Sequence, residues 1–276
     1  MIEIKAAEGG VIMCDNVYVF RNGKYFQIQE PIFLVRFFDK REYAEEFQSG
    51  KIRMGNAALY REMENESGDT IRGDAYEHKI PFYNGADFLD INDSDTDEPL
   101  YMTTAKNFIC CFYSYKENNV AYIDSNAIVL KITDGLDKFD EKWKFAVVID
   151  YNKFSRVFDN AVNSFDYKAH MSVRYFDFSN RDEANKYNLD IMKYYTTGAI
   201  NKHTPPPLSF VKDVKYKYQQ EYRYVVGHNY SLQELVDEDR GVIEKKFIYI
   251  EIGDISEFSA ICSISGITGS KGLVWV

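Results

Sequence analysis

Several features that would assign a protein class at once are missing from this 276-residue chain. It has no apolar run of about 18 residues, which excludes a transmembrane helix. Its first residues lack a basic lead followed by an apolar stretch, so no secretory signal is expected. The four cysteines form no Cys-x-x-Cys pair, which favours reduced thiols and a cytoplasmic location, and Cys110 and Cys111 are expected in a strand core.

The common catalytic signatures are absent too. The sequence contains no GxGxxG, GxxxxGK[ST], HExxH or GxSxG motif, and its four histidines lack the spacing of metal ligands. The acidic segment 87–99 superficially resembles a calcium loop. It has Glu98 where that loop needs glycine and Thr104 where it needs a bidentate glutamate, so we interpret it as a solvated loop.

Basic residues are in deficit, with 33 Lys and Arg against 43 Asp and Glu and a net charge of −10. This balance counts against a protein that holds nucleic acid through a large basic surface. Nucleic acid stays open as a substrate, because a local cleft can differ in sign from the whole molecule.

Aromatic residues, by contrast, are abundant, and 22 Tyr and 20 Phe favour strands and core packing. Asn22-Gly23 predicts a hairpin turn, and a helix is expected between Asp39 as N-cap and Gly50. Strand patterns occur at 32–38, 108–115, 127–133, 145–150, 171–178, 218–226, 246–252 and 260–265, and helical patterns at 57–66, 152–163, 181–195 and 231–237. We therefore expect one α+β domain over 1–276, with a mainly antiparallel sheet, peripheral helices and an appended hairpin at 11–29.

The most informative stretch covers residues 216–226. At the two-residue period of a strand, one face is aromatic and suits a core. The opposite face carries Gln219, Glu221 and Arg223. That polar face is either the solvated side of a strand, with the two charges pairing, or a cleft wall where a carboxylate does chemistry.

Arg36 stands out within the apolar strand pattern 32–38. A guanidinium there must be paired or face a cavity, because burying it alone is very costly. Two interpretations stay open: an ion pair with an acidic residue on a neighbouring strand, or an anchor for a phosphate or a ribose.

An early strand arginine, a helix ending in glycine and a late Gln-x-Glu segment resemble the mono-ADP-ribosyltransferases. The matching pieces are Arg36, the helix from Arg41 to Gly50, and Gln219-Gln220-Glu221. The Ser-Thr-Ser-like strand of those enzymes would fall in 108–115, where Ser114 and a run of aromatics match. The resemblance implies a split, mainly antiparallel sheet with NAD as co-substrate and no metal.

A second resemblance is to a family of uncharacterised bacterial and phage proteins. It rests on an Arg-Gly-Asp-x-x-Glu loop at 72–77, on Cys111-Phe112 and on Gln219-Gln-Glu-Tyr-Arg223. That family more often has Glu where this chain has Gln219.

The transferase resemblance implies a role for each matching residue. Glu221 would stabilise the positive charge that develops on the ribose as its bond to nicotinamide breaks, and Gln219 would help to select the acceptor. Glu221→Gln should then abolish activity with little loss of stability, because the group faces a cleft. The remaining implied contacts are Arg36, Phe112, Tyr113, Ser114 and Tyr115 for NAD, and Tyr216 or Tyr218 for the acceptor.

The acceptor implied by the resemblance is a macromolecule, either RNA, DNA or protein. By analogy such a cytoplasmic enzyme would be a toxin, a phage effector or an antiviral defence factor, and a partner protein could inhibit it. Two alternatives stay open. One is a metal-dependent nuclease or hydrolase that uses Asp69, Asp74 and Glu77 with Glu221. The other is a non-catalytic protein that docks a partner through a tyrosine-rich surface.

Overall fold

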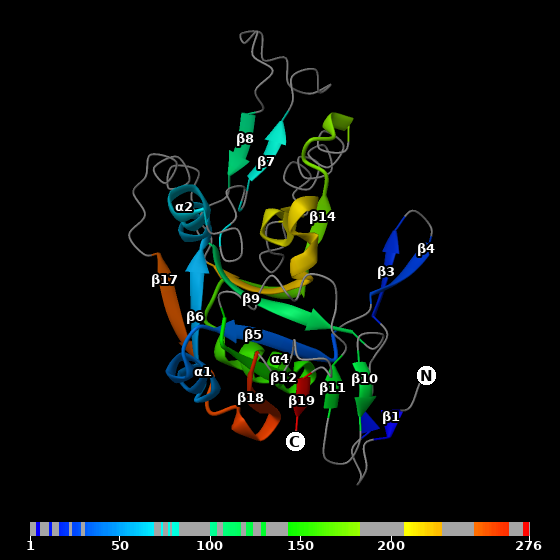
Figure 1. Ribbon diagram of the computed structural model, residues 1–276. Coiled ribbons are helices and arrows are strands. Elements are labelled where there is room, and N and C mark those ends of the chain that lie inside the picture. Colours follow the sequence, from blue (N-terminus) through cyan, green and yellow to red (C-terminus); the bar gives the residue numbers. More distant parts are fainter. Residues whose placement is uncertain are drawn as a thin grey trace, which may run out of the picture.

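The computed structural model describes five long segments and several short strands (Figure 1). The long segments are residues 31–68, 107–116, 143–182, 207–227 and 246–264, to which Gly73 and Glu77 are added. The short strands are at 4–5, 11–12, 17–21, 24–28, 79–82, 100–103, 120–123, 128–130 and 273–275. The acidic segment 87–99, the predicted helix at 231–237 and most of the one at 181–195 lie outside the described residues.

An eight-stranded sheet in which every described pairing is antiparallel forms the centre of the molecule. Its order is β13-β16-β9-β5-β12-β18, and β6 joins β9 and β17. The bounds are β5 (Phe33–Phe38), β6 (Lys51–Asn56), β9 (Asn107–Tyr115), β12 (Phe145–Asp150), β13 (Tyr167–Ser172), β16 (Glu221–Gly227), β17 (Phe247–Glu251) and β18 (Ser259–Ser263). This is the α+β class predicted from the sequence.

The sheet forks at β9. One edge of β9 pairs with β16, and its other edge pairs with two different strands. Along that second edge, β6 pairs at Phe108 and Ile109, whereas β5 pairs from Tyr113 onward. No described strand pairs with residues 110–112 on that edge, so β6 and β17 form one limb while β5, β12 and β18 form the other (Figure 1).

Two helices cover one face of the sheet with an aromatic core. α1 (Arg41–Gln48) and α4 (Tyr151–Ala161) contribute Phe47 and Phe154 to the same buried cluster as Tyr224 of β16. The rings of Phe154 and Tyr224 meet edge to face with centroids 5.2 Å apart. The aromatic face of residues 222–226 is therefore the core face, as the alternation predicted.

Helix boundaries follow local chemistry, with one difference from prediction. The N-cap of α1 is Lys40, without a side-chain cap, whereas Asp39 lies in the lining of a cavity. The chain turns after α1 at Gly50, whose φ is 98° and where a Cβ atom would lie 2.0 Å from the Gly253 carbonyl oxygen. α2 (Ala57–Ser67) begins as expected, with the Asn56 side chain accepting a hydrogen bond from the Leu59 N–H.

The predicted strand over 218–226 is wrong at its start. Residues Val214–Gln219 form a 3-10 helix, η3, and Gln220 adopts a left-handed φ of 40° before β16 begins at Glu221. The backbone N–H and Oγ of Ser114 both donate to the Gln220 carbonyl, at 3.0 and 2.7 Å, and hold this bend. Gln219 and Glu221 therefore do not share a strand face.

The remaining elements are short. The predicted hairpin is present as β3 (Val17–Arg21) and β4 (Lys24–Ile28), and the predicted strand 171–178 is divided between β13 and β14 (Arg174–Phe176). The others are β1 (Ile4–Lys5), β2 (Val11–Ile12), β7 (Lys79–Phe82), β8 (Leu100–Thr103), β10 (Val120–Ile123), β11 (Ile128–Leu130), β15 (Val211–Asp213), β19 (Leu273–Trp275), η2 (Pro207–Phe210) and η4 (Ser256–Phe258). Among the helices of the described segments, none is long and apolar enough to cross a membrane.

Candidate functional site

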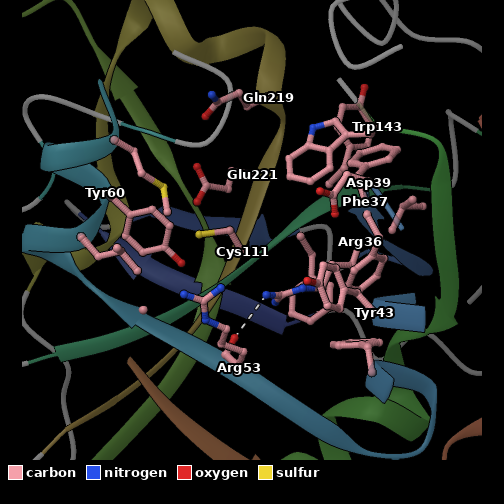
Figure 2. Close-up of a pocket in the computed structure, with 18 of the residues that line it drawn as sticks. Arg36, Phe37, Asp39, Tyr43, Arg53, Tyr60, Cys111, Trp143, Gln219 and Glu221 are labelled. Carbon is pink, nitrogen blue, oxygen red and sulfur yellow. Dashed lines mark hydrogen bonds between the residues drawn. The ribbon is translucent and has the colours of Figure 1, made fainter. Parts of the chain in front are cut away.

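A cavity of about 550 Å³ opens where the sheet forks. Its lining comes from β5, β6, β9, β17, α1, α2 and the segment that leads into β16. Figure 2 shows Glu221, Cys111 and the Arg36 guanidinium around the same space, with Tyr60 on one side and Trp143 on the other. A volume of this size lies within the range of roughly 300–1,000 Å³ that is common for small-molecule sites.

Glu221 is fixed at the first position of β16. Its N–H donates to the Tyr175 hydroxyl at 2.9 Å, and its side chain is only 5% exposed. Arg223 Nε donates to one carboxylate oxygen at 2.7 Å, and Lys212 Nζ lies 2.9 Å from the other. Burial alone would raise the pKa of Glu221, but Arg223 and Lys212 outweigh it and lower that pKa to about 2. Glu221 is therefore an oriented anion at neutral pH.

Arg223 links Glu221 to a distant part of the chain. It is completely buried, and its two terminal nitrogens donate to the two carboxylate oxygens of Glu77, each at 2.7 Å. It also donates to the Ser209 carbonyl at 2.6 Å. A forked pair of this kind is strong and directional. The polar face of β16 is thus buried rather than solvated, which corrects one part of the first interpretation, whereas the predicted pairing of Glu221 with Arg223 is confirmed.

Gln219 reaches the same network from η3. Its side-chain oxygen accepts a hydrogen bond from Lys212 Nζ at 2.7 Å, so Lys212 bridges Gln219 and Glu221. Gln219 and Glu221 both line the cavity, although Gln219 lies on η3 and Glu221 lies on β16. Lys212 was not predicted as a site residue from the sequence. The sequence does contain a signal, because Lys212 directly follows the apolar pair Phe210-Val211. A lysine in such a buried segment needs an acidic partner.

The structure also bears on the metal-dependent alternative. Asp69 and Asp74 lie outside the described residues, while Glu77 and Glu221 both bind Arg223. The guanidinium takes the place between these carboxylates that a shared cation would need. Within the described segments, no group of three or more His, Cys, Asp or Glu side chains could hold a metal ion.

Arg36 lies in the gap of the fork. Its Nη2 donates to the Arg53 carbonyl at 3.2 Å, its Nη1 contacts the Cys110 thiol, and its guanidinium lies 5.3 Å from the Phe47 ring centroid (Figure 2). None of the described carboxylates forms an ion pair with Arg36, so the predicted ion pair is not found there. Aromatic rings provide its surroundings instead, which is a known environment for a partly desolvated cation.

The two adjacent thiols differ in position. Cys110 is fully buried in the aromatic core, whereas Cys111 lines the cavity. Burial raises the pKa of Cys110 to about 11, and burial together with the Glu221 charge raises the pKa of Cys111 well above its usual value. Both cysteines are therefore protonated at neutral pH, and Cys111 is not an activated nucleophile.

The other residues implied for NAD or acceptor binding divide into two groups. Phe112 and Tyr113 line the cavity. The rest surround it as support: Ser114 binds the Gln220 carbonyl, Tyr115 is 1% exposed, the Tyr216 hydroxyl donates to Glu64, and Tyr218 packs against the cluster that contains Tyr115.

Three short motifs that are far apart in the sequence meet at this site. Glu77, Cys111-Phe112 and Glu221 all line the cavity, and Arg223 binds both carboxylates. No protein-family model matches this chain, and no curated protein or solved structure matches it either. A functional proposal for this protein therefore rests on the chemistry of the cavity.

Proposed function

We propose that the protein is a mono-ADP-ribosyltransferase that transfers ADP-ribose from NAD to a macromolecular acceptor. The observation that carries the proposal is Glu221, an ionised carboxylate held rigidly in a cavity that also contains the Arg36 guanidinium and several aromatic rings. The forked antiparallel sheet supports it further, because a split sheet is what the resemblance to these enzymes implies.

The cavity offers a partner for each chemical part of NAD. The Arg36 guanidinium has donors beyond the two that contact described residues, and these suit a diphosphate. Phe37, Tyr113 and Trp143 provide aromatic surface for the nicotinamide ring. The Glu221 carboxylate would lie beside the ribose that carries the reacting carbon.

The proposed chemistry needs a carboxylate that is charged before the reaction begins. As the bond between the ribose C1′ and nicotinamide breaks, its electron pair leaves with nicotinamide and positive charge develops on the sugar. Glu221 stabilises this charge electrostatically, and Arg223 and Lys212 hold its carboxylate in one orientation.

The proposal is tested by incubating the purified protein with NAD, labelled in its adenylate phosphate, and cell lysate. We expect label transfer and nicotinamide release by the wild type, and a loss of both in Glu221→Gln. Glu64→Gln is the matched control, because Glu64 binds Tyr216 and Lys215 outside the cavity lining. Circular dichroism must show both variants folded at the assay temperature. If the folded wild type showed no label transfer and no nicotinamide release, the proposal would be refuted.

We extend the proposal, by analogy with such transferases, to a cytoplasmic toxin or an antiviral defence factor restrained by a partner protein. Its test is expression in bacteria with and without phage challenge. Growth arrest or phage resistance that Glu221→Gln abolishes would support this role. A folded protein that changes neither growth nor phage yield would contradict it.

A further inference from the structure

The limb formed by β6 and β17 carries a strip of basic and aromatic side chains beside the cavity. The strip consists of Lys51 and Arg53 from β6 with Phe247 and Tyr249 from β17. Tyr249 pairs directly with Arg53 in the antiparallel register, so these side chains share one face of the two strands. The opposite face belongs to the core, where Ile52 and Met54 are fully buried.

Cations and rings alternate along the strip. Lys51 Nζ lies 4.5 Å from the Tyr249 ring centroid, and Arg53 Cζ lies 4.3 Å from that of Phe247. The two rings meet edge to face with centroids 5.7 Å apart. Phe247 is nevertheless 41% exposed and Tyr249 is 47% exposed. The strip is thus an ordered platform of exposed ring surface and cationic groups.

One of the two cations of the strip has carboxylate neighbours, because Glu251 lies opposite Lys51 in the register of β6 and β17. Lys51 pairs with Glu46 at 2.5 Å, but Arg53 forms no ion pair with any described carboxylate. Arg36 lies behind it, bonded to the Arg53 carbonyl. The Arg36 and Arg53 guanidiniums, which have no described carboxylate partners, therefore both lie where the strip joins the cavity. Their positive charge favours phosphate at this point despite the net charge of −10 of the whole protein.

We infer that this strip binds single-stranded nucleic acid, and that nucleic acid is the ADP-ribose acceptor; the second part rests on the proposed function. Exposed rings stack unpaired bases of any sequence, and neighbouring cations contact the phosphates. A duplex keeps its bases stacked inside and needs a larger basic surface. Arg53 can contact phosphate directly, whereas Lys51 would have to exchange Glu46 for a phosphate, so the strip suits at most about two phosphates of a flexible strand.

The position of the strip connects binding to transfer. Lys51, Arg53 and Tyr249 line the same cavity as Glu221, so a strand on the strip leads toward the proposed reaction centre. In the transfer, a base nitrogen or a sugar hydroxyl of the acceptor forms a bond to the ribose C1′ as nicotinamide leaves with its electron pair. The acceptor then loses its proton to water.

Binding is tested without NAD, by fluorescence anisotropy of fluorescein-labelled single-stranded RNA and DNA of mixed sequence. For two phosphate contacts, the logarithm of the association constant should fall with the logarithm of salt concentration at a slope of about −1.4. Tyr249→Ala should weaken binding roughly 5- to 150-fold. Arg53→Ala should weaken it for every sequence and reduce the steepness of the salt slope by about 0.7. Arg41→Ala is the matched control, because Arg41 is exposed and pairs with Glu45 on α1.

The remaining outcomes of the binding and transfer assays distinguish the strip from the transferase proposal. No binding at low salt, equal competition by duplex, or identical binding by Arg53→Ala, Tyr249→Ala and the control would overturn the inference. ADP-ribose transfer to protease-sensitive but nuclease-resistant material would overturn it while leaving the transferase proposal intact. Conversely, single-strand binding that depends on Tyr249, without any nicotinamide release, would establish the strip as a nucleic-acid-binding site and refute the proposed transferase activity.

Discussion

Glu221→Gln should destabilise the protein as well as inactivate it. The pKa of Glu221 falls from 4.5 to about 2 on folding. Because the folded-state pKa is the lower one, the carboxylate stabilises the fold above about pH 4.5, and this contribution is lost as the pH falls toward 2. At about 1.4 kcal/mol per pH unit, the charged form contributes on the order of 3 kcal/mol at pH 7. Solvent screening reduces this little, since Glu221 is 5% exposed.

The assay is urea-induced unfolding followed by intrinsic fluorescence, at pH 7 and near pH 3. The substituted glutamine keeps the shape of the Glu221 side chain but not its charge, so Arg223 and Lys212 lose a buried counter-ion. We expect the wild type to exceed the variant by about 3 kcal/mol at pH 7, and by roughly half of that near pH 3. Glu64→Gln serves as the control for a carboxylate outside the cavity lining.

A stability difference below about 1 kcal/mol at pH 7, the value typical of an exposed pair, would contradict a buried and paired Glu221 carboxylate. A difference that does not change with pH would contradict it equally. Either result would mean that Arg223 and Lys212 do not hold Glu221 as a buried anion. The expectation from sequence, a cleft carboxylate with little effect on stability, would then be correct after all.

Three further predictions concern an ion pair, a glycine turn and a cavity residue, and the second of them uses another glycine as its control. Glu77→Ala removes the forked partner of the fully buried Arg223 and should cost about 3–5 kcal/mol in urea unfolding, whereas an unchanged midpoint would contradict the buried pair. Gly50→Ala should lower the free energy of unfolding by about 3 kcal/mol or more, because the added Cβ would lie 2.0 Å from a carbonyl oxygen at a residue with positive φ. Gly68 also has a positive φ but has open space around it, so Gly68→Ala should cost only about 1–2 kcal/mol. Equal losses of stability in the two variants would contradict a steric clash at Gly50. Arg36→Ala should weaken NAD binding roughly 10- to 150-fold in calorimetric titration, and unchanged affinity would remove Arg36 from the site.

Elements with strong local patterns could be predicted from the sequence. The apolar run 32–38 forms β5, the capping side chain of Asn56 begins α2, and residues 151–161 form the amphipathic α4. Caps, turns and hydrophobic periodicity depend on residues that are close in the sequence, so a short segment is sufficient to predict them. β6 was missed, although its signal is present in the alternation of charged Lys51 and Arg53 with apolar Ile52 and Met54.

The bend before β16 could not be read in the same way. Residues 218–226 alternate as a strand would, yet Gln220 takes a left-handed conformation that non-glycine residues rarely adopt. The cause lies 106 positions away, where Ser114 binds the Gln220 carbonyl. Local preference is overridden there by a contact that no window of sequence contains.

The sequence by itself determined the α+β class, the aromatic core face of β16 and the presence of Arg36 and Glu221 as charges that need partners. The tertiary structure alone decided what those partners are. Glu221 contacts Lys212 and Arg223, and Arg223 contacts Glu77, which lies 146 positions away in the sequence. Among the described groups, Arg36 contacts aromatic rings instead of a carboxylate. The physical reason is that hydrophobic periodicity specifies which face is buried, whereas buried charges are satisfied by whichever groups the packing of distant segments brings within hydrogen-bonding distance.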